Sequence, residues 1–128
     1  MSRETILWDM NEINAGSMQF LPNMKTDISL ESNNRKIIID TKFYKDSLIT
    51  GQYGNRRIHS GNLYQIVSYL ENVKYDQNKS LEGILLYPTI DESLDLKYDY
   101  RGKQVSIKTI NLNQNWKELS TDLLNIIA

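Results

Sequence analysis

The spacing of apolar residues predicts three helices. The clearest covers residues 61–72 and follows Ser60, a residue type that caps helices. A short helix is expected over 3–13, and a last one over about 113–127. The apolar residues that these helices should bury are Ile6, Leu7, Met10 and Ile13 in the first, Leu63, Ile66, Val67 and Leu70 in the second, and Trp116, Leu119, Leu123 and Ile127 in the third. Trp8 and Trp116 are interpreted as core anchors.

Shorter stretches show the alternation, or the continuous apolar run, of β-strands. The polar residues 31–34 predict a hairpin turn between the first two strands. Residues 46–58 form a loop or a weak third strand, and Arg101–Gly102 predicts a second hairpin turn. The predicted strands cover 24–30, 36–43, 81–87, about 94–100 and 103–110. The order α-β-β-(β)-α-β-β-β-α predicts an α/β (α+β) fold, in which helices flank a central mixed sheet.

Length and composition are those of a globular protein. The 128 residues suffice for one domain (1–128), and 40% of them are hydrophobic and 24% charged. No apolar run approaches the roughly 20 residues that span a bilayer, so we expect a cytoplasmic protein with no membrane partner. There is no cysteine for a disulfide or a thiolate metal site. The formal net charge of −1 excludes a protein held on nucleic acid by bulk positive charge alone.

Charged residues at the end of strand 36–43 are the candidate catalytic and metal-binding residues. Asp40 and Lys42 leave the same face, because side chains alternate along a strand. Asp27 lies on the preceding hairpin arm, and a tight turn would bring it close to Asp40. Two converging carboxylates repel unless a cation lies between them, and Mg²⁺ suits this role, with the backbone carbonyl of Thr41 as a further ligand. Lys42 would then lie near a metal-bound water or a phosphate.

These acidic and basic residues also have a structural interpretation, as exposed hairpin charges. An Asp-x-Lys triplet is short, and the chain holds a second one at 95–97, which we interpret as a solvated strand edge. Gln65 and Tyr69 are spaced i, i+4 on helix 61–72. They could reach the metal site or a phosphate, or they could form an ordinary polar helix surface with Gln65 pointing well away from the core.

Positive charge gathers between residues 44 and 62, and an anionic ligand would prefer this region. Arg56 and Arg57 could bind the DNA backbone, or they could belong to a solvated loop. His59 could contact phosphate or DNA near the site, or it could be a surface residue that caps the helix. One histidine without an evident acidic partner gives no support for a Ser-His-Asp triad or a zinc site.

Taken together, Asp27, Asp40-x-Lys42 and Gln65-x-x-x-Tyr69 are similar to the PD-(D/E)xK nuclease pattern in its RecB-like form. Longer strings resemble the nuclease domain of McrC, the cleaving subunit of modified-cytosine-dependent restriction systems. They are LPNMKTDISL, KIIIDTKFYK, HSGNLYQIVSYL, EGILLYP and TINLNQNWKELSTDLLNII. The resemblance covers about residue 20 to the C-terminus, and LWDMNEI is similar to the start of that domain's first helix.

The resemblance implies a restriction-endonuclease-like core and a DNA endonuclease that depends on Mg²⁺, or on Mn²⁺ in its place. Asp27 and Asp40 would be metal ligands and Lys42 the catalytic lysine. Gln65 and Tyr69 would support the site or contact DNA. An acid on the first helix often completes such a site, and the best candidate is Glu12.

The resemblance also implies a partner, the GTP-driven AAA+ protein McrB, which recognises methylated sites and moves DNA. Residues 1–17 would be a shortened N-terminal helical segment, and 18–128 the sheet core and C-terminal helix. The portion that docks McrC on McrB has no counterpart here, so a fragment or a shortened homologue is expected. A second hypothesis is therefore a catalytically silent domain that keeps this fold to bind DNA or its AAA+ partner.

Overall fold

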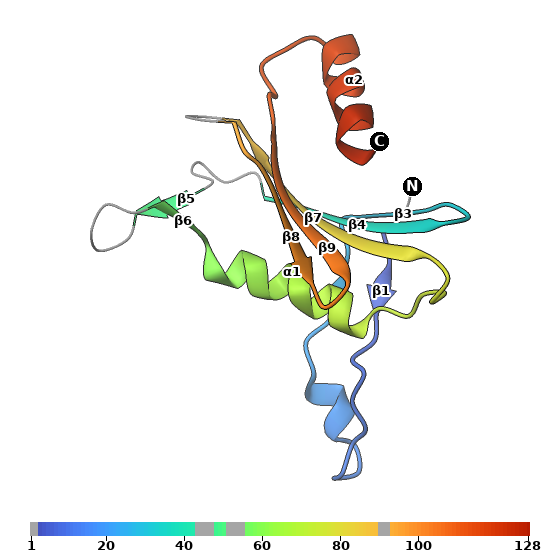
Figure 1. The fold of residues 1–128 in the computed structure, drawn as a ribbon. Coiled ribbons are helices and arrows are strands. Elements are labelled where there is room, and N and C mark those ends of the chain that lie inside the picture. Colours follow the sequence, from blue (N-terminus) through green and yellow to red (C-terminus); the bar gives the residue numbers. More distant parts are fainter. Residues whose placement is uncertain (1–2, 43–47, 51–55, 90–92) are drawn as a thin grey trace.

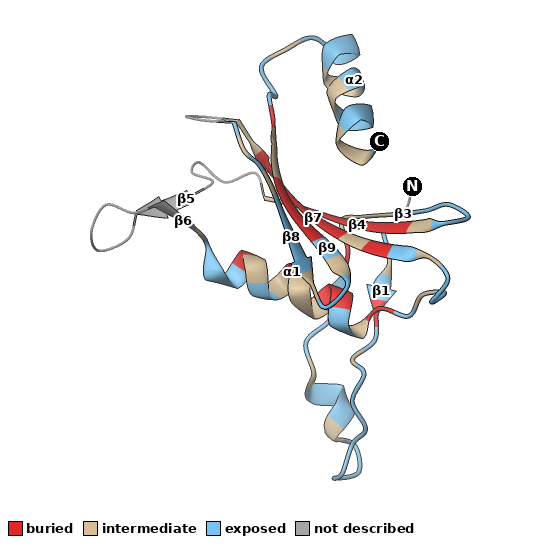
Figure 2. Cartoon of the chain, in the orientation of Figure 1, coloured by how far each residue is buried: buried red, intermediate tan, exposed pale blue. Residues whose placement is uncertain are grey.

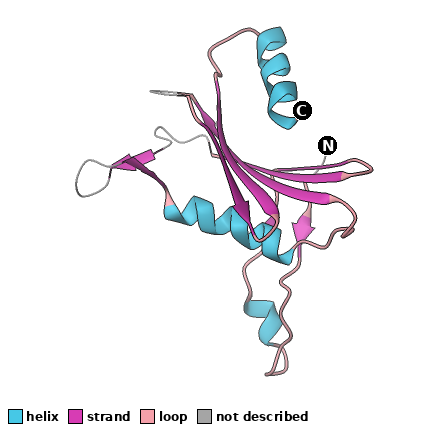
Figure 3. Ribbon diagram, viewed as in Figure 1, coloured by secondary structure: helices cyan, strands magenta, loops and turns pink. Residues whose placement is uncertain are grey.

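A mixed β-sheet carries one helix on each face in the computed structural model, which describes residues 3–42, 48–50, 56–89 and 93–128 (Figures 1 and 3). The sheet strands are β3 (Ile28–Glu31), β4 (Arg35–Thr41), β7 (Ser80–Pro88), β8 (Asp95–Tyr100) and β9 (Lys103–Ile110). The helices are α1 (Ser60–Asn72) and α2 (Trp116–Ile127), with a 3-10 turn, η1 (Ser17–Phe20). Two small ladders pair β1 (Thr5–Ile6) with β2 (Met24–Lys25), and β5 (Leu48–Thr50) with β6 (Arg56–Ile58). The expected α/β class with a mixed sheet is confirmed.

The strand order in the sheet is β3-β4-β7-β9-β8. The inner strands β4, β7 and β9 run parallel, and the two edge strands pair antiparallel to their neighbours. Parallel neighbours need a crossover connection, and α1 lies in the one between β4 and β7. Because β4, β7 and β9 point the same way, their carboxyl ends lie along one edge of the sheet. The end of β4, with the candidate site residues Asp40 and Lys42, lies at this edge.

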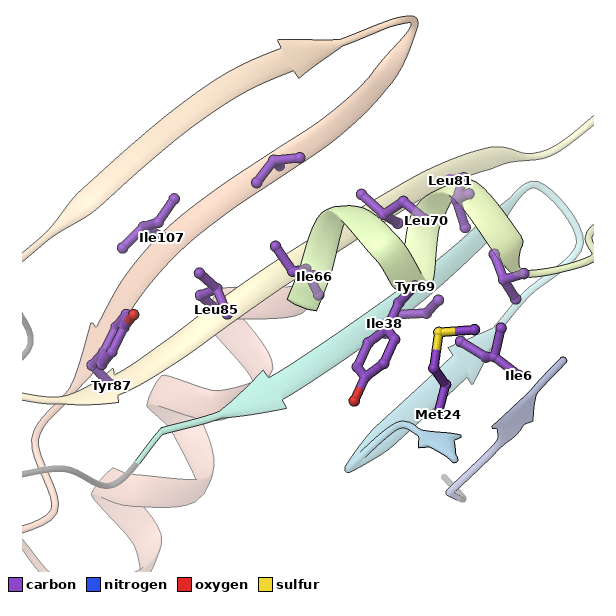
Figure 4. Close-up of a cluster of buried hydrophobic side chains, with 12 residues drawn as sticks. Ile6, Met24, Ile38, Ile66, Tyr69, Leu70, Leu81, Leu85, Tyr87 and Ile107 are labelled. Carbon is purple, nitrogen blue, oxygen red and sulfur yellow. The ribbon is translucent and has the colours of Figure 1, made fainter. Parts of the chain in front are cut away.

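The three consecutive isoleucines of β4 serve both faces of the sheet, because side chains alternate along the strand. Ile38 lies in a buried cluster with Ile66 and Leu70 of α1 (Figure 4). Ile37 and Ile39 belong to the cluster on the opposite face, against which α2 packs. Figure 2 shows the consequence, a buried central sheet between two helices. Asp40 therefore follows Ile38 on the α1 face.

The helix expected over residues 3–13 is wrong. Thr5 and Ile6 instead form β1, which pairs with Lys25 and Met24. Only Ile6 of the expected apolar face is buried, while Leu7, Met10 and Ile13 are 70%, 53% and 98% exposed. The physical reason is that Ile6 and Met24 are buried together by a ladder between residues far apart in the sequence, which a local periodicity does not register.

The single strand expected over residues 24–30 is broken at Thr26 and Asp27. β2 pairs with β1, whereas β3 pairs with β4. The Thr26 hydroxyl accepts a hydrogen bond from the Glu4 backbone N–H at 2.9 Å and lies 2.9 Å from Ser29 Oγ, which satisfies polar groups at the break. This bend carries Asp27 out of regular strand geometry.

Helix α1 begins at Ser60 and its N-cap is His59, so the assignment of Ser60 as the cap is wrong. The core stripe of α1 is confirmed: Ile66 and Leu70 are buried, and Leu63 and Val67 pack against the same cluster. Residues 46–58 contain β5 and β6, the weak strand structure that was one of the two expectations.

Helix α2 contacts the sheet through Leu119, Ile126 and Ile127. The expected burial of Trp116 and Leu123 is wrong, because Trp116 is 73% exposed and Leu123 is 36% exposed. The helix is present, but its apolar stripe is wider than the surface it covers.

Trp8 is half-buried against the main cluster and donates to the carbonyl of Pro22 at 2.8 Å, so it packs on the core rather than inside it.

The expected hairpin between β8 and β9 is present, and Arg101 and Gly102 both adopt positive φ, 52° and 81°, as a tight hairpin turn requires. In the described parts of the chain, no helix is long and apolar enough to cross a membrane.

Candidate active site

The end of β4 places Asp40 between the sheet and α1. Asp40 is 3% exposed, two residues beyond Ile38 on the same face. Its Oδ2 atom lies 3.0 Å from Nζ of Lys42, whose side chain is 12% exposed. The backbone N–H of Lys42 donates to the carbonyl of Leu86 on β7 at 2.8 Å. The lysine is therefore anchored at both its backbone and its charged end.

Asp27 reaches this site from the bend before β3. The β3–β4 ladder ends at the pair Ile28–Ile39, and one step further along each strand come Asp27 and Asp40. Oδ2 of Asp27 accepts two hydrogen bonds of 2.9 Å, from the backbone N–H and the Oγ1 hydroxyl of Thr41. The hairpin thus brings the two carboxyl groups close enough to interact.

Helix α1 supplies a chain of hydrogen bonds to the lysine. Nζ of Lys42 donates to Oε1 of Gln65 at 2.5 Å, and Nε2 of Gln65 donates to the Tyr69 hydroxyl at 2.7 Å. That hydroxyl donates in turn to the carbonyl of Lys25 on β2 at 3.3 Å. Tyr69 is 4% exposed. The alternative in which Gln65 points well away on an ordinary helix surface is therefore wrong, because the helix turns both side chains toward the end of β4.

The two carboxyl groups differ in their acidity. Burial raises the pKa of Asp40 to about 6, and the charge of Asp27 adds to this, while the ion pair with Lys42 opposes it. Burial also raises the pKa of Asp27, but the two hydrogen bonds from Thr41, together with the interactions with Asp40 and Lys42, outweigh it and the net pKa is lowered. Burial raises the pKa of Tyr69, so its hydroxyl keeps its proton at neutral pH. Near neutral pH, the site therefore holds one firmly ionised acid beside one that ionises at a cost.

The donor set suits a small divalent cation. Mg²⁺ needs one or two protein carboxylates and fills its remaining positions with water or substrate oxygens. Oδ2 of Asp40 is buried and has no hydrogen-bond partner of good geometry among the described residues, although Lys42 lies close to it. A cation between Asp27 and Asp40 would relieve that unsatisfied oxygen and the repulsion of the pair. The residues present therefore fit a magnesium site.

The structure does not bring Glu12 into this group. Oε2 of Glu12 accepts a hydrogen bond from the Met18 backbone N–H at 3.1 Å, within the exposed segment between β1 and β2 (Figure 2). Across the described ranges of the chain, no three His, Cys, Asp or Glu side chains converge as a metal-binding group. The helix expected to carry Glu12 toward the sheet does not form, so its assignment as a ligand loses its geometric basis.

The candidate DNA contacts lie where β6 leads into α1. His59 is exposed at the N-cap position of the helix, without a side-chain capping hydrogen bond. Arg56 and Arg57 belong to β6, and their side chains lie outside the described part of the structure. Their assignment as DNA contacts stays a prediction.

Sequence reasoning missed the role of the Thr41 side chain, which was considered only for its carbonyl. It also missed a buried pair beside the site, in which Nδ2 of Asn62 donates to the Tyr87 hydroxyl at 2.9 Å. Asn62 precedes Gln65 by three residues on α1 and is 5% exposed, while Tyr87 is fully buried at the end of β7. This pair could have been found from Asn62, which is a polar residue at a core-facing position of the helix, one position before Leu63.

Comparison with known proteins gives two findings. Residues 9–88 match the family described as McrBC 5-methylcytosine restriction system component, a stretch that includes the site at the end of β4 and on α1. A protein of Escherichia coli (strain K12), described as the type IV methyl-directed restriction enzyme EcoKMcrBC, is 34% identical over 125 residues. The aligned part is 98% of this chain but 36% of that relative, so the chain spans about a third of the relative's length.

Proposed function

The chain belongs to the McrBC family of 5-methylcytosine restriction system components, and from this premise we propose that it is a nuclease domain that cleaves DNA with the help of Mg²⁺. The proposal includes a restriction-endonuclease-like core of the PD-(D/E)xK type. The mixed sheet with a helix on each face, and a site at the end of an inner strand, support it.

One observation carries the proposal: Asp27, Asp40 and Lys42 converge where β4 ends. Three charged groups that meet at a buried strand end serve chemistry better than stability, because burying them costs free energy. The second Asp-x-Lys triplet of the chain makes the contrast. Asp95 and Lys97 lie exposed on the edge strand β8, where water screens them.

In this proposal Asp27 and Asp40 hold the cation, with the carbonyl of Thr41 as a third oxygen. A bound Mg²⁺ would polarise the phosphate and make its water a better nucleophile. Lys42, fixed by Asp40 and Gln65, keeps a positive charge where a phosphodiester oxygen becomes more negative. Tyr69 holds the amide of Gln65 in the orientation that lets its oxygen face the lysine.

A plasmid-cleavage assay with Mg²⁺ or Mn²⁺ tests the proposal. The wild-type chain should nick or linearise DNA, and Asp40→Ala and Lys42→Ala should each reduce the rate by at least about 100-fold. Asp95→Ala and Lys97→Ala are the matched controls, since they remove the same residue types from the exposed triplet. Cleavage that survives Asp40→Ala, or that falls equally in the controls, would count against the assigned site.

The domain would act as part of a larger assembly that restricts DNA containing 5-methylcytosine. A GTP-driven AAA+ partner of the McrB type would select the methylated site and deliver the DNA. The family membership supports this, and the net charge of −1 fits a domain to which a partner delivers the DNA, because no excess of positive charge holds the DNA there. The cleavage assay should therefore be run both alone and with such a partner and GTP.

A second candidate function is a catalytically silent domain that binds DNA or the AAA+ partner. It is favoured by the lack of a third acidic ligand at Asp27 and Asp40 within the described residues, since Glu12 lies elsewhere. Binding of DNA or partner without metal-dependent cleavage, in the presence and absence of that partner, would support this function over the first.

A further inference from the structure

We propose that the hydroxyl of Thr41 is a positioning group for the cation site, which it prepares by fixing the carboxylate of Asp27. The inference rests on the proposed metal-dependent function and extends it to a residue whose side chain has no assigned role. Thr41 would thus act through Asp27 and not through contact with the substrate.

The backbone of β4 at its end sets the position of the Asp27 carboxylate. The ladder with β3 stops at the pair Ile28–Ile39, so β3 offers no backbone acceptor to the N–H of Thr41. Oδ2 of Asp27 takes that place, at 2.9 Å. The carboxylate of Asp27 thus continues the sheet by one hydrogen bond, which fixes how far it can lie from β4.

The Thr41 hydroxyl bonds the same carboxylate. Oγ1 of Thr41 also donates to Oδ2 of Asp27 at 2.9 Å, so two donors from one residue hold the same oxygen. Two donors on one oxygen restrict rotation of the carboxylate as well as its position. The second oxygen, Oδ1, is then the one that a cation shared with Asp40 would take.

The residue type at position 41 also supports a role for the hydroxyl. The side chain of Thr41 is half-buried, and a valine there would keep the shape and the backbone N–H while losing only the hydroxyl. Strand propensity therefore does not require threonine at this position, because valine suits a strand equally well. Groups that orient a metal ligand in this way typically contribute about 10-fold to 100-fold to metal affinity.

The test measures Mn²⁺ binding to the full chain by the loss of the free-ion signal in electron paramagnetic resonance. Thr41→Val should weaken Mn²⁺ binding by about 10-fold or more, and Thr41→Ser, which keeps the hydroxyl, should restore it. Thr109→Val is the matched control, since Oγ1 of Thr109 accepts from the Leu94 N–H at 2.9 Å at the end of β9, and it should leave Mn²⁺ binding unchanged. Thermal unfolding without metal establishes that each variant is folded, and Thr41→Ala replaces Thr41→Val if the valine variant is not.

The outcomes separate this inference from the proposed function. Wild-type binding that Asp40→Ala abolishes but Thr41→Val leaves intact would overturn the role of Thr41 and keep the metal site. Equal losses in Thr41→Val and Thr41→Ser would also overturn it, because the hydroxyl would then not matter. A wild-type chain that binds no Mn²⁺ would overturn both.

Discussion

At the scale of single residues, the site opposes the stability of the protein. The folded chain buries Asp40 beside Asp27, and among the described residues Lys42 compensates for its charge. A group that titrates near pH 6 in the folded protein and near 3.8 when unfolded makes folding depend on pH. Two predictions follow from this arrangement and from the hydrogen bonds around it.

The first prediction concerns Asp40→Asn in the absence of divalent ions. Between pH 3.8 and about 6, the folded state keeps a proton that the unfolded state has lost, so the free energy of unfolding falls as pH rises through this range. Above it a destabilisation of about 2–3 kcal/mol persists. Asp40→Asn removes this destabilisation, so the variant should be more stable than the wild type at pH 7.5 but not at pH 4. Urea unfolding with EDTA at several pH values measures this.

Asp95→Asn is the control for that measurement, since Asp95 is exposed on β8 and its replacement should change little at any pH. A gain from Asp40→Asn that is the same at pH 4 and pH 7.5 would contradict the explanation by a buried charge. Addition of Mg²⁺ should stabilise the wild type and leave Asp40→Asn unaffected, because the variant loses a ligand.

The second prediction concerns the hydroxyl of Tyr69. Tyr69→Phe removes the acceptor of Gln65 Nε2 and the donor to Lys25, so the amide that holds Lys42 loses its orientation. We expect a loss of about 1 kcal/mol in unfolding free energy, together with at least a 10-fold loss in cleavage rate. Tyr98→Phe on the exposed edge strand should change neither. A cleavage rate equal to that of the wild type would show that Lys42 does not need this support.

How much of the site could be predicted depends on the range of the contacts involved. Asp40 and Lys42 could be placed together because both lie on one strand, and alternation sets their common face. The hydrogen bond between the Thr41 hydroxyl and Asp27 could not be predicted, because it depends on the bend at Thr26 and on the register at which β3 begins. Neither leaves a periodic trace in the sequence.

At the scale of elements, β4 and α1 were predictable because each carries a complete local pattern. The continuous apolar run of β4 is typical of a strand buried on both faces, and the apolar stripe of α1 needs only the one sheet face on which it packs. The failure at residues 3–13 has the opposite cause. Ile6 gains its burial from Met24, eighteen positions away, while the rest of that apparent helical face finds no partner.

Gly83 on β7 tests how closely α1 must approach the sheet. A Cβ atom there would lie 2.8 Å from Cγ1 of Ile66 and 3.0 Å from Cδ1 of Leu70. Gly83→Ala should therefore push α1 outward, with a destabilisation of about 1–3 kcal/mol and a loss of cleavage as Gln65 moves away from Lys42. Urea unfolding and the plasmid assay measure the two effects.

Gly61→Ala is the matched control for this crowding. It lies in the first turn of the same helix, where a Cβ atom would meet the ring of the exposed His59 at 3.3 Å. Alanine favours helix, so this variant should be as stable as the wild type or slightly more stable. Equal stability of Gly83→Ala and Gly61→Ala would mean that the packing of α1 on β7 adjusts at no cost.

At the scale of the whole molecule, the layers set where DNA could approach. The carboxyl ends of β4, β7 and β9 share one edge of the sheet, and β6 leads directly from this side into α1. At the opposite end of β4, Arg35 pairs with Glu82, and Lys36 pairs with Glu4 and Glu31. Arg56 and Arg57 lie just before α1, so we expect them to be available to phosphates near the site.

Because the net charge of the chain is only −1, removing Arg56 and Arg57 should have a measurable effect on DNA binding. If Arg56 and Arg57 each contact a phosphate, the double variant Arg56→Ala/Arg57→Ala should weaken DNA binding at every sequence alike. The slope of log affinity against log salt should fall by about 2, one unit for each lost phosphate contact. The control removes Lys97 and Arg101, two cations from β8 and its turn, so the net charge changes equally in both variants. An equal loss of salt dependence in the two would mean that total charge, and not the side of the molecule beside Asp40, governs the encounter with DNA.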